Sequence, residues 1–152
     1  MDKFDKAILA ALQQQGRMSN QELADAIGLS PSPCLRRLRA LEEAGFIDGY
    51  GARLNARKLG LTLTAFIQIS LDKHTPERFA SFEKKLTKLP EVLECHLITG
   101  QQADYLVKVI VKDMDAYQHF LLNKLTTIEG ITGVHSSFVL KSPVQDNHLP
   151  LD

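Results

Sequence analysis

Two helix starts separated by a glycine turn constrain the fold of this chain more than any other sequence feature. Ser19 followed three residues later by Glu22 is a capping-box pattern, and it predicts a short helix over residues 20–26. Gly28 then supplies a tight turn, and Ser30 offers the N-cap of a longer helix. A short helix, a turn and a longer helix in this order predict a helix-turn-helix.

The longer helix is predicted to run over residues 30–44 and to carry polar side chains on one face. Pro31 and Pro33 fall in its first turn, where backbone N–H groups have no helical acceptor, so they do not interrupt it. At 100° per residue, the opposite, apolar face includes Cys34 and Leu41. The candidate DNA-contacting residues lie on the polar face, on its flank and at the helix start: Ser30, Ser32, Pro33, Arg36, Arg37 and Arg39.

Arginine suits this role because a guanidinium can bridge guanine O6 and N7 or pair with a phosphate. We expect Arg36 to read bases and Arg37, which lies between the two faces, to contact phosphate. An exposed basic helix also occurs for solubility alone. The capped helix before it and the predicted wing after it favour the DNA-binding interpretation.

The charge distribution agrees with this assignment, although the whole chain is neutral, with 18 Lys and Arg against 18 Asp and Glu. Residues 1–60 carry nine basic and seven acidic side chains, whereas residues 61–152 carry nine and eleven. Residues 28–58 carry six basic and three acidic side chains. The positive charge is therefore concentrated around the predicted recognition helix, where phosphate contacts need it.

A glycine-rich segment, residues 45–55, follows the recognition helix. Its apolar and β-favouring residues on either side of the glycines predict two short strands around a turn, at the position of a wing. A first helix is predicted over residues 2–15. Residues 1–55 are therefore expected to form a winged helix-turn-helix domain, with residues 56–61 as a linker.

Residues 62–141 show a different rhythm, in which strand and helix patterns alternate. Their order, β-α-β-β-α-β, is that of a ferredoxin-like sandwich, which makes the chain α+β. A unit of about 80 residues is small, so we expect a homo-oligomer that buries one sheet face. Residues 142–152 are predicted to be a tail. The predicted elements of the sandwich are residues 63–71, 76–89, 92–99, 105–111, 114–125 and 131–140.

Composition and motif spacing argue against several functional classes. No apolar run approaches the roughly 20 residues that span a bilayer, and the charged start of the chain does not fit a signal peptide. We therefore expect a cytoplasmic, nucleoid-associated protein with no membrane partner. Cys34 and Cys95 and the five histidines have no disulfide or metal-site spacing, so no metal, cofactor or catalytic residue is expected. Both cysteines are expected to pack as small hydrophobic residues, with redox sensing as the weaker alternative.

Polar residues interrupt the apolar sheet at residues 100–105 and again at Ser136 and Ser137. A glycine-containing connection exposes backbone groups that can hold the carboxylate and ammonium of an amino acid, and Asp104 can pair with the ammonium. An ordinary β-hairpin with a solvated aspartate explains the same spacing. Spacing alone favours this simpler interpretation.

Several longer motifs occur together along the chain: Asp5, Gly16–Asn20, Gly28–Leu38, Leu41-Glu42, Gly45–Tyr50, Glu94–Leu97, Thr99-Gly100, Asp104–Leu106 and Asp113-Met114. With these motifs, nearly the whole chain resembles the Lrp/AsnC, or feast/famine, family of bacterial and archaeal regulators. The resemblance implies a winged helix-turn-helix joined to a RAM or ACT-like sandwich that drives dimers and assembly to tetramers or octamers. It also implies an amino-acid effector bound between subunits, at Gly100, Gln101, Gln102, Asp104, Tyr105, Ser136 and Ser137.

The loop from Gly100 to Tyr105 is one residue longer than the family's usual Gly-x-x-Asp-Tyr, with Gln102 or Ala103 as the insertion. Leucine is therefore not assumed as the effector, and either leucine or another small amino acid is expected.

The sequence thus predicts a sequence-specific DNA-binding transcription regulator whose assembly is modulated by a bound amino acid. One alternative is an effector-independent, nucleoid-architectural protein in which the sandwich serves only oligomerisation. A second is a tetrapyrrole-processing decarboxylase of similar fold, using His96, His119 or His135. The arginines of the predicted recognition helix argue against this enzyme.

Overall fold

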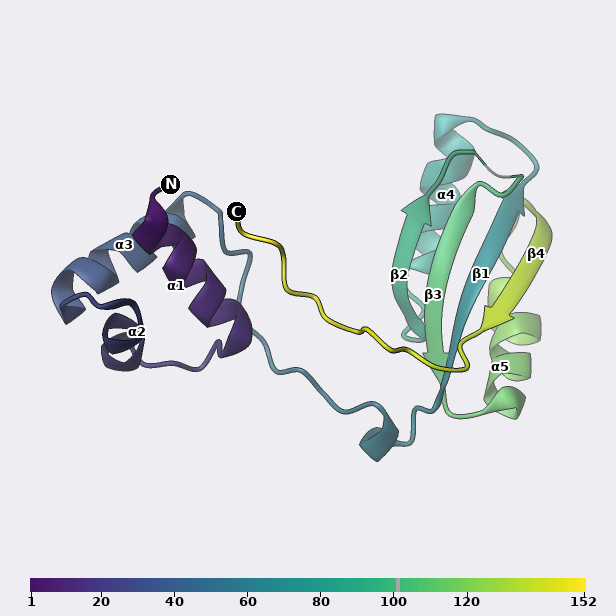
Figure 1. The fold of residues 1–152 in the computed structure, drawn as a ribbon. Coiled ribbons are helices and arrows are strands. Elements are labelled where there is room, and N and C mark those ends of the chain that lie inside the picture. The colour runs from purple at the N-terminus through teal and green to yellow at the C-terminus, as the bar shows by residue number, and fades with distance from the viewer. Residues whose placement is uncertain (101) are drawn as a thin grey trace. The chain divides into compact units, whose positions relative to one another are not determined.

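The computed structural model describes residues 1–100 and 102–152 (Figure 1). The chain divides into two compact units. The helical unit comprises residues 1–54 together with the C-terminal residues 144–152, and the sheet unit comprises residues 55–143. The chain therefore passes from the helical unit to the sheet unit and then returns.

Three helices form the helical unit: α1 (Lys3–Gln14), α2 (Asn20–Ile27) and α3 (Pro31–Glu43). The predicted capping box is confirmed, since Ser19 accepts from the N–H of Glu22 and the Glu22 carboxylate accepts from the N–H of Ser19. Gly28 ends α2 with φ 72°, a left-handed conformation that favours glycine.

The start of α3 differs in detail from the prediction. Ser30 occupies the N-cap position, but its hydroxyl makes no capping hydrogen bond. The usual targets of such a hydroxyl are the N–H groups two and three residues later. Pro33 stands at the third position and has no N–H to donate, which removes one of the two targets.

The core of the helical unit consists of side chains from all three helices, and Cys34 lies within it at 0% exposure. Burial raises the pKa of the Cys34 thiol, which disfavours the reactive thiolate. Cys95 in the sheet unit is half-buried, and burial and then Glu83 raise its pKa to about 11. Both environments favour packing over redox sensing. The fully or nearly buried side chains of the helical unit are Ile8, Leu9, Leu23, Ala24, Cys34 and Leu41.

The predicted two-stranded wing is wrong, because residues 45–55 contain no strand. An isolated pair of short strands is marginal in water. The segment is held instead by side chains directed at the helices. Ile47 packs against the helical core, and the Tyr50 hydroxyl donates to the Glu42 carboxylate at 2.8 Å.

The sheet unit confirms the predicted βαββαβ order. A short 3-10 helix, η1 (Arg57–Leu59), precedes four antiparallel strands in the spatial order β2-β3-β1-β4. Helices α4 and α5 cover one face of the sheet (Figure 1). The elements are β1 (Leu63–Leu71), α4 (Pro76–Leu86), β2 (Val92–Leu97), β3 (Tyr105–Val111), α5 (Met114–Phe120), the π-helical turn η2 (Leu121–Leu125) and β4 (Ile131–Phe138).

The core of the sheet unit follows from strand alternation. Every second residue of β1 and β3 is buried, from Ala65 to Leu71 and from Tyr105 to Val111. These side chains meet Phe82 of α4 and Phe120 of α5, both at most 1% exposed. The intervening residues of both strands point to the face of the sheet opposite α4 and α5.

Replacement of Phe82 tests this core. Its ring lies 4.7 Å from that of Tyr105, centre to centre, and is fully buried. We expect Phe82→Ala to lower the free energy of unfolding by about 3–5 kcal/mol, measured by urea denaturation at one fixed protein concentration. Glu77→Ala, on the exposed side of α4, is the control, with an expected change within about 0.5 kcal/mol. Equal effects of the two substitutions would contradict the assigned core.

Candidate DNA-binding face and ligand-binding end of the sheet

The polar face of α3 is exposed as the wheel predicts. Ser32, Arg36 and Arg39 are all exposed and line one shallow hollow together with Glu43. Neither Arg36 nor Arg39 forms an ion pair within the described residues. Their guanidinium groups are therefore available for phosphates or base edges.

The start of α3 adds a favourable field to this face. Ser30 is exposed there and Pro33 is half-buried. The N-terminal end of a helix carries a partial positive charge, which attracts phosphate. Ser30 and Ser32 also offer hydroxyl groups beside that end.

Arg37 departs from the expected phosphate contact, because its guanidinium faces α1. One Arg37 nitrogen lies 2.8 Å from the Asp2 carboxylate and 2.9 Å from the Asp5 carboxylate. The guanidinium also lies over the Phe4 ring, 5.4 Å from its centre. The N–H of Asp5 and then Arg37 lower the pKa of the Asp2 carboxyl, while Asp5 and then Asp2 raise that of Arg37. We therefore assign Arg37 to holding α3 against the start of α1.

The loop between β2 and β3 is pinned to the end of β1 by Asp104. Its carboxylate accepts the Leu71 N–H at 2.7 Å and lies 2.9 Å from Nε2 of His74. Its backbone N–H donates to Ile69 and its carbonyl accepts from Ile98, both at 2.9 Å. Asp104 is thus half-buried and partnered, unlike the solvated aspartate of an ordinary hairpin.

Two more of the predicted loop residues lie at this end of the sheet. Gly100 is exposed with φ 86°, a left-handed conformation that favours glycine. Gln102 is exposed, and its carbonyl accepts the Ser70 hydroxyl at 3.3 Å. Gln101 lies outside the described residues.

Tyr105 points away from this loop. Its side chain is 1% exposed, and its hydroxyl donates to the Glu83 carboxylate of α4 at 2.7 Å. Burial, followed by Glu83, raises the Tyr105 pKa. The side chain therefore supports the core beneath the loop and does not line its surface.

Ser136 and Ser137 lie on opposite faces of the sheet and away from the loop. Ser136 pairs with Ile67 of β1 and contacts the Tyr117 hydroxyl of α5, on the helix-covered face. Ser137 pairs with Phe66 and points to the other face. The Asp104 carboxylate lies at Leu71, four residues beyond Ile67 and five beyond Phe66 along β1. At roughly 3.4 Å per residue this is about 14 Å from the level of Ser136 and about 17 Å from that of Ser137. One chain alone therefore does not bring the serines to Asp104.

Comparison with known proteins accounts for both units. Residues 1–48 match the family model of a winged helix-turn-helix DNA-binding domain, and residues 64–149 match that of the Lrp/AsnC ligand binding domain. The chain belongs to the Lrp/AsnC family. The predicted α+β fold class and the resemblance to this family are confirmed.

Relatives of this Lrp/AsnC protein are transcription regulators. The Bkd operon transcriptional regulator of Pseudomonas aeruginosa is 44% identical over 99% of this chain and 98% of its own length. The leucine-responsive regulatory protein of Escherichia coli K12 is 42% identical over 98% of this chain and 90% of its own. This chain is accordingly a DNA-binding transcription regulator with a ligand-binding domain, and the interpretation as an enzyme is wrong.

Two solved structures are similar in fold to this chain over nearly its whole length. A transcriptional regulator from Neisseria meningitidis, solved in complex with L-Met, is 43% identical with a TM-score of 0.96, covering 100% of this chain and 97% of that one. AsnC of Escherichia coli is 33% identical with a TM-score of 0.89, covering 99% of each chain.

The described residues of this Lrp/AsnC regulator give two further findings. They contain no group of three His, Cys, Asp or Glu side chains arranged to hold a metal ion. In the same part of the chain, every helix is too short or too polar to cross a bilayer.

His74 and Glu83 contact candidate site residues, and the sequence patterns did not indicate either of them. His74 contacts Asp104, and Glu83 holds the hydroxyl of Tyr105. Each lies more than 20 residues from its partner in sequence, and neither belongs to a motif that signals the contact. The pairing of β1 with β3 brings His74 near Asp104, and the packing of α4 on the sheet brings Glu83 to Tyr105.

The cluster of Arg37 and Asp2 predicts a pH-dependent stability. The folded-state pKa of Asp2 is depressed below its ordinary value of 3.8, so its stabilising effect is present above that value and is lost as the pH falls through the depressed one. We expect Arg37→Gln to lower Tm at pH 7, and the gap to wild type to narrow below about pH 4. Circular dichroism melts from pH 7 to pH 3 measure this.

The matched control is Arg36→Gln, which removes an exposed arginine one residue earlier with no ion pair in the described residues. It should leave Tm unchanged at every pH. A gap between wild type and Arg37→Gln that stays constant down to pH 3 would contradict the assigned cluster.

Proposed function

We propose that this Lrp/AsnC regulator recognises double-stranded DNA sequence-specifically through the polar face of α3. Ser32, Arg36 and Arg39 would contact base edges and phosphates, with Ser30 and Pro33 at the helix start nearest the DNA. The observation that carries the proposal is the pair of exposed arginines without an ion-pair partner in the described residues. A protein of this kind acts at the nucleoid, in the cytoplasm.

Arginine replacement tests the DNA-binding face. We expect Arg36→Ala to weaken binding to a cognate operator by about 1–3 kcal/mol. The difference in affinity between cognate and non-cognate DNA should also become smaller. Loss of a phosphate contact by Arg39→Ala should reduce the slope of log K against log salt by about 1. Lys84→Ala, which removes an exposed charge from α4 of the sheet unit, is the control for net charge. Equal losses in all three variants would contradict the assigned face.

We further propose that an amino acid binds at the end of the sheet formed by Gly100, Gln102 and Asp104. Each Asp104 oxygen already has one partner and retains a lone pair that can accept an ammonium N–H. The matched ligand-binding domain and the L-Met complex of the Neisseria meningitidis regulator support an amino acid as the ligand. Leucine and methionine are the first candidates, because one relative is a leucine-responsive regulatory protein and another was solved in complex with L-Met.

The proposed assembly is a homo-oligomer, from dimer to tetramer or octamer. Phe66, Leu106 and Ile110 lie half-buried on the face of the sheet opposite α4 and α5, and an apolar face on so small a unit supports burial against another copy. Ser136 and Ser137 would then reach an effector site only as residues of a different copy. The amino acid shifts the assembly to the extent that its affinity differs between two arrangements.

A thermal-shift screen against all twenty amino acids tests the ligand. A ligand at 100 times its Kd stabilises the folded state by about 2.7 kcal/mol, so we expect a clear rise in Tm with one or two of them. Gln102→Ala should reduce that rise, whereas Gln118→Ala, on the exposed side of α5, should not. No shift with any amino acid would instead favour the effector-independent architectural protein.

A further inference from the structure

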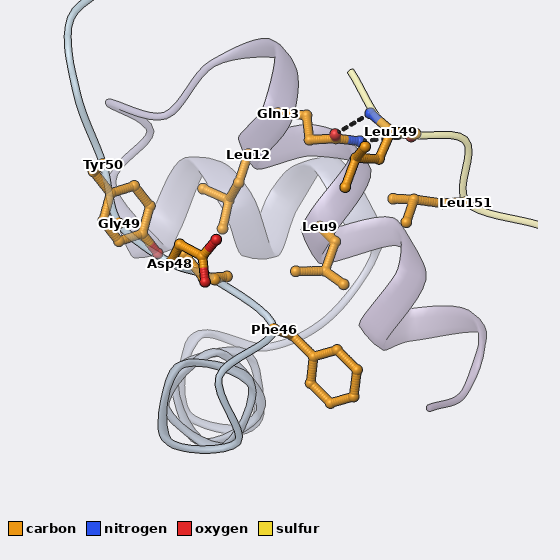
Figure 2. Close-up of a pocket in the computed structure, with 10 residues that line it drawn as sticks. Leu9, Leu12, Gln13, Phe46, Asp48, Gly49, Tyr50, Leu149 and Leu151 are labelled. Atoms are coloured by element: carbon orange, nitrogen blue, oxygen red, sulfur yellow. Dashed lines mark hydrogen bonds between the residues drawn. The ribbon is translucent and has the colours of Figure 1, made fainter. Parts of the chain in front are cut away.

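The C-terminal tail, residues 144–152, belongs to the helical unit and lies on α1. The side-chain amide of Gln13 donates to the Leu149 carbonyl at 3.1 Å and accepts the Leu149 N–H at 2.6 Å (Figure 2). One amide that both donates to and accepts from the same residue reproduces the pairing of neighbouring β-strands. Gln13 therefore fixes both the position and the direction of the tail backbone.

Apolar side chains make a second contact with the tail. Leu9 and Leu12 of α1 line a groove of about 250 Å³, and Leu149 and Leu151 of the tail complete its wall (Figure 2). Leu151 packs against the helical core, whereas Leu149 stays 71% exposed. The remaining wall comes from the segment that was predicted to be a wing: Phe46, Ile47, Asp48, Gly49 and Tyr50.

The tail is shaped locally for this contact. Asp146 accepts the N–H of His148 at 3.1 Å and lies 3.1 Å from Nδ1 of the same histidine, which forms a turn just before Leu149. Pro150 restricts the backbone between Leu149 and Leu151. Both features reduce the conformational freedom that docking must remove.

We propose that this groove is a docking surface for the chain's own C-terminal segment, and that the docked tail forms a second, reversible connection between the two units. The chain leaves the helical unit at residue 55 and returns to it at residue 144. With the tail docked, two connections restrict the movement of the DNA-binding unit, and with the tail released only one remains. Attachment in the same chain gives the tail an effective concentration on the order of millimolar, so two hydrogen bonds and one leucine suffice for docking.

Hydrogen exchange of the full-length protein tests the docking. In wild type, the C-terminal peptide should exchange more slowly than an unstructured chain, because the Leu149 N–H is bonded. Gln13→Leu, which removes both hydrogen bonds, and Leu151→Ser, which removes the apolar contact, should each speed this exchange about tenfold. Gln15→Ala and Val144→Ser, which alter exposed residues outside these contacts, should not. Unprotected exchange in wild type would overturn the docking.

Tryptic cleavage tests the second connection. The exposed Arg53 lies just beyond the segment that lines the groove. Release of the tail should therefore speed cleavage after Arg53 several-fold in Gln13→Leu and Leu151→Ser, but not in the two controls. Unchanged cleavage in a variant whose tail has become unprotected would overturn the connection.

A photo-crosslinking residue at position 149 identifies the occupant of the groove. Crosslinks to α1 that leave the mass on a denaturing gel unchanged support docking within one chain. Crosslinks to α1 that double the mass would overturn that assignment in favour of a tail supplied by a second copy.

Discussion

The proposed DNA-binding face depends on how α3 packs against the rest of the helical unit. Cys34 and Leu41 are buried on one side of α3, and Arg37 is held by Asp2 and Asp5 at the start of α1. An apolar contact alone permits a helix to rotate by part of a turn, whereas a guanidinium held by two carboxylates does not. With these contacts made, the opposite side of α3 must face solvent, and its remaining arginines stay available.

The sheet unit is held in a similar way at its proposed ligand-binding end. Asp104 joins the loop between β2 and β3 to the end of β1 through backbone and side-chain bonds, and the buried Tyr105 beside it reaches Glu83 of α4. Asp104, held in this way, presents its carboxylate in a fixed position, which lowers the entropic cost of holding a small ligand. In the proposed site Asp104 both supports the loop and accepts the ammonium of the ligand, whereas Tyr105 and Glu83 act only as support.

Local signals made most of the fold predictable from sequence. The capping box at Ser19 and the alternation of β1 depend on neighbours within a few residues, and both were predicted correctly. Contacts between distant residues were not predictable, such as Arg37 with Asp2, 35 residues apart, and Gln13 with Leu149, 136 residues apart. The prediction of two wing strands was wrong for a related reason. Glycines and β-favouring residues form a hairpin only where further packing stabilises the two strands.

The proposed effector site likewise combines features that the sequence indicates with positions that only the structure gives. Polar interruptions of an apolar pattern marked both the loop and the two serines, and the family resemblance assigned both to an effector site. Their positions relative to one another required the register of β4 against β1. A step of one residue along a strand moves a side chain to the opposite face, and Ser136 and Ser137 differ by that step. If both contact one amino acid, they must do so from different directions. An effector that joins them to Asp104 would then bridge copies of the chain, and its binding would be inseparable from assembly.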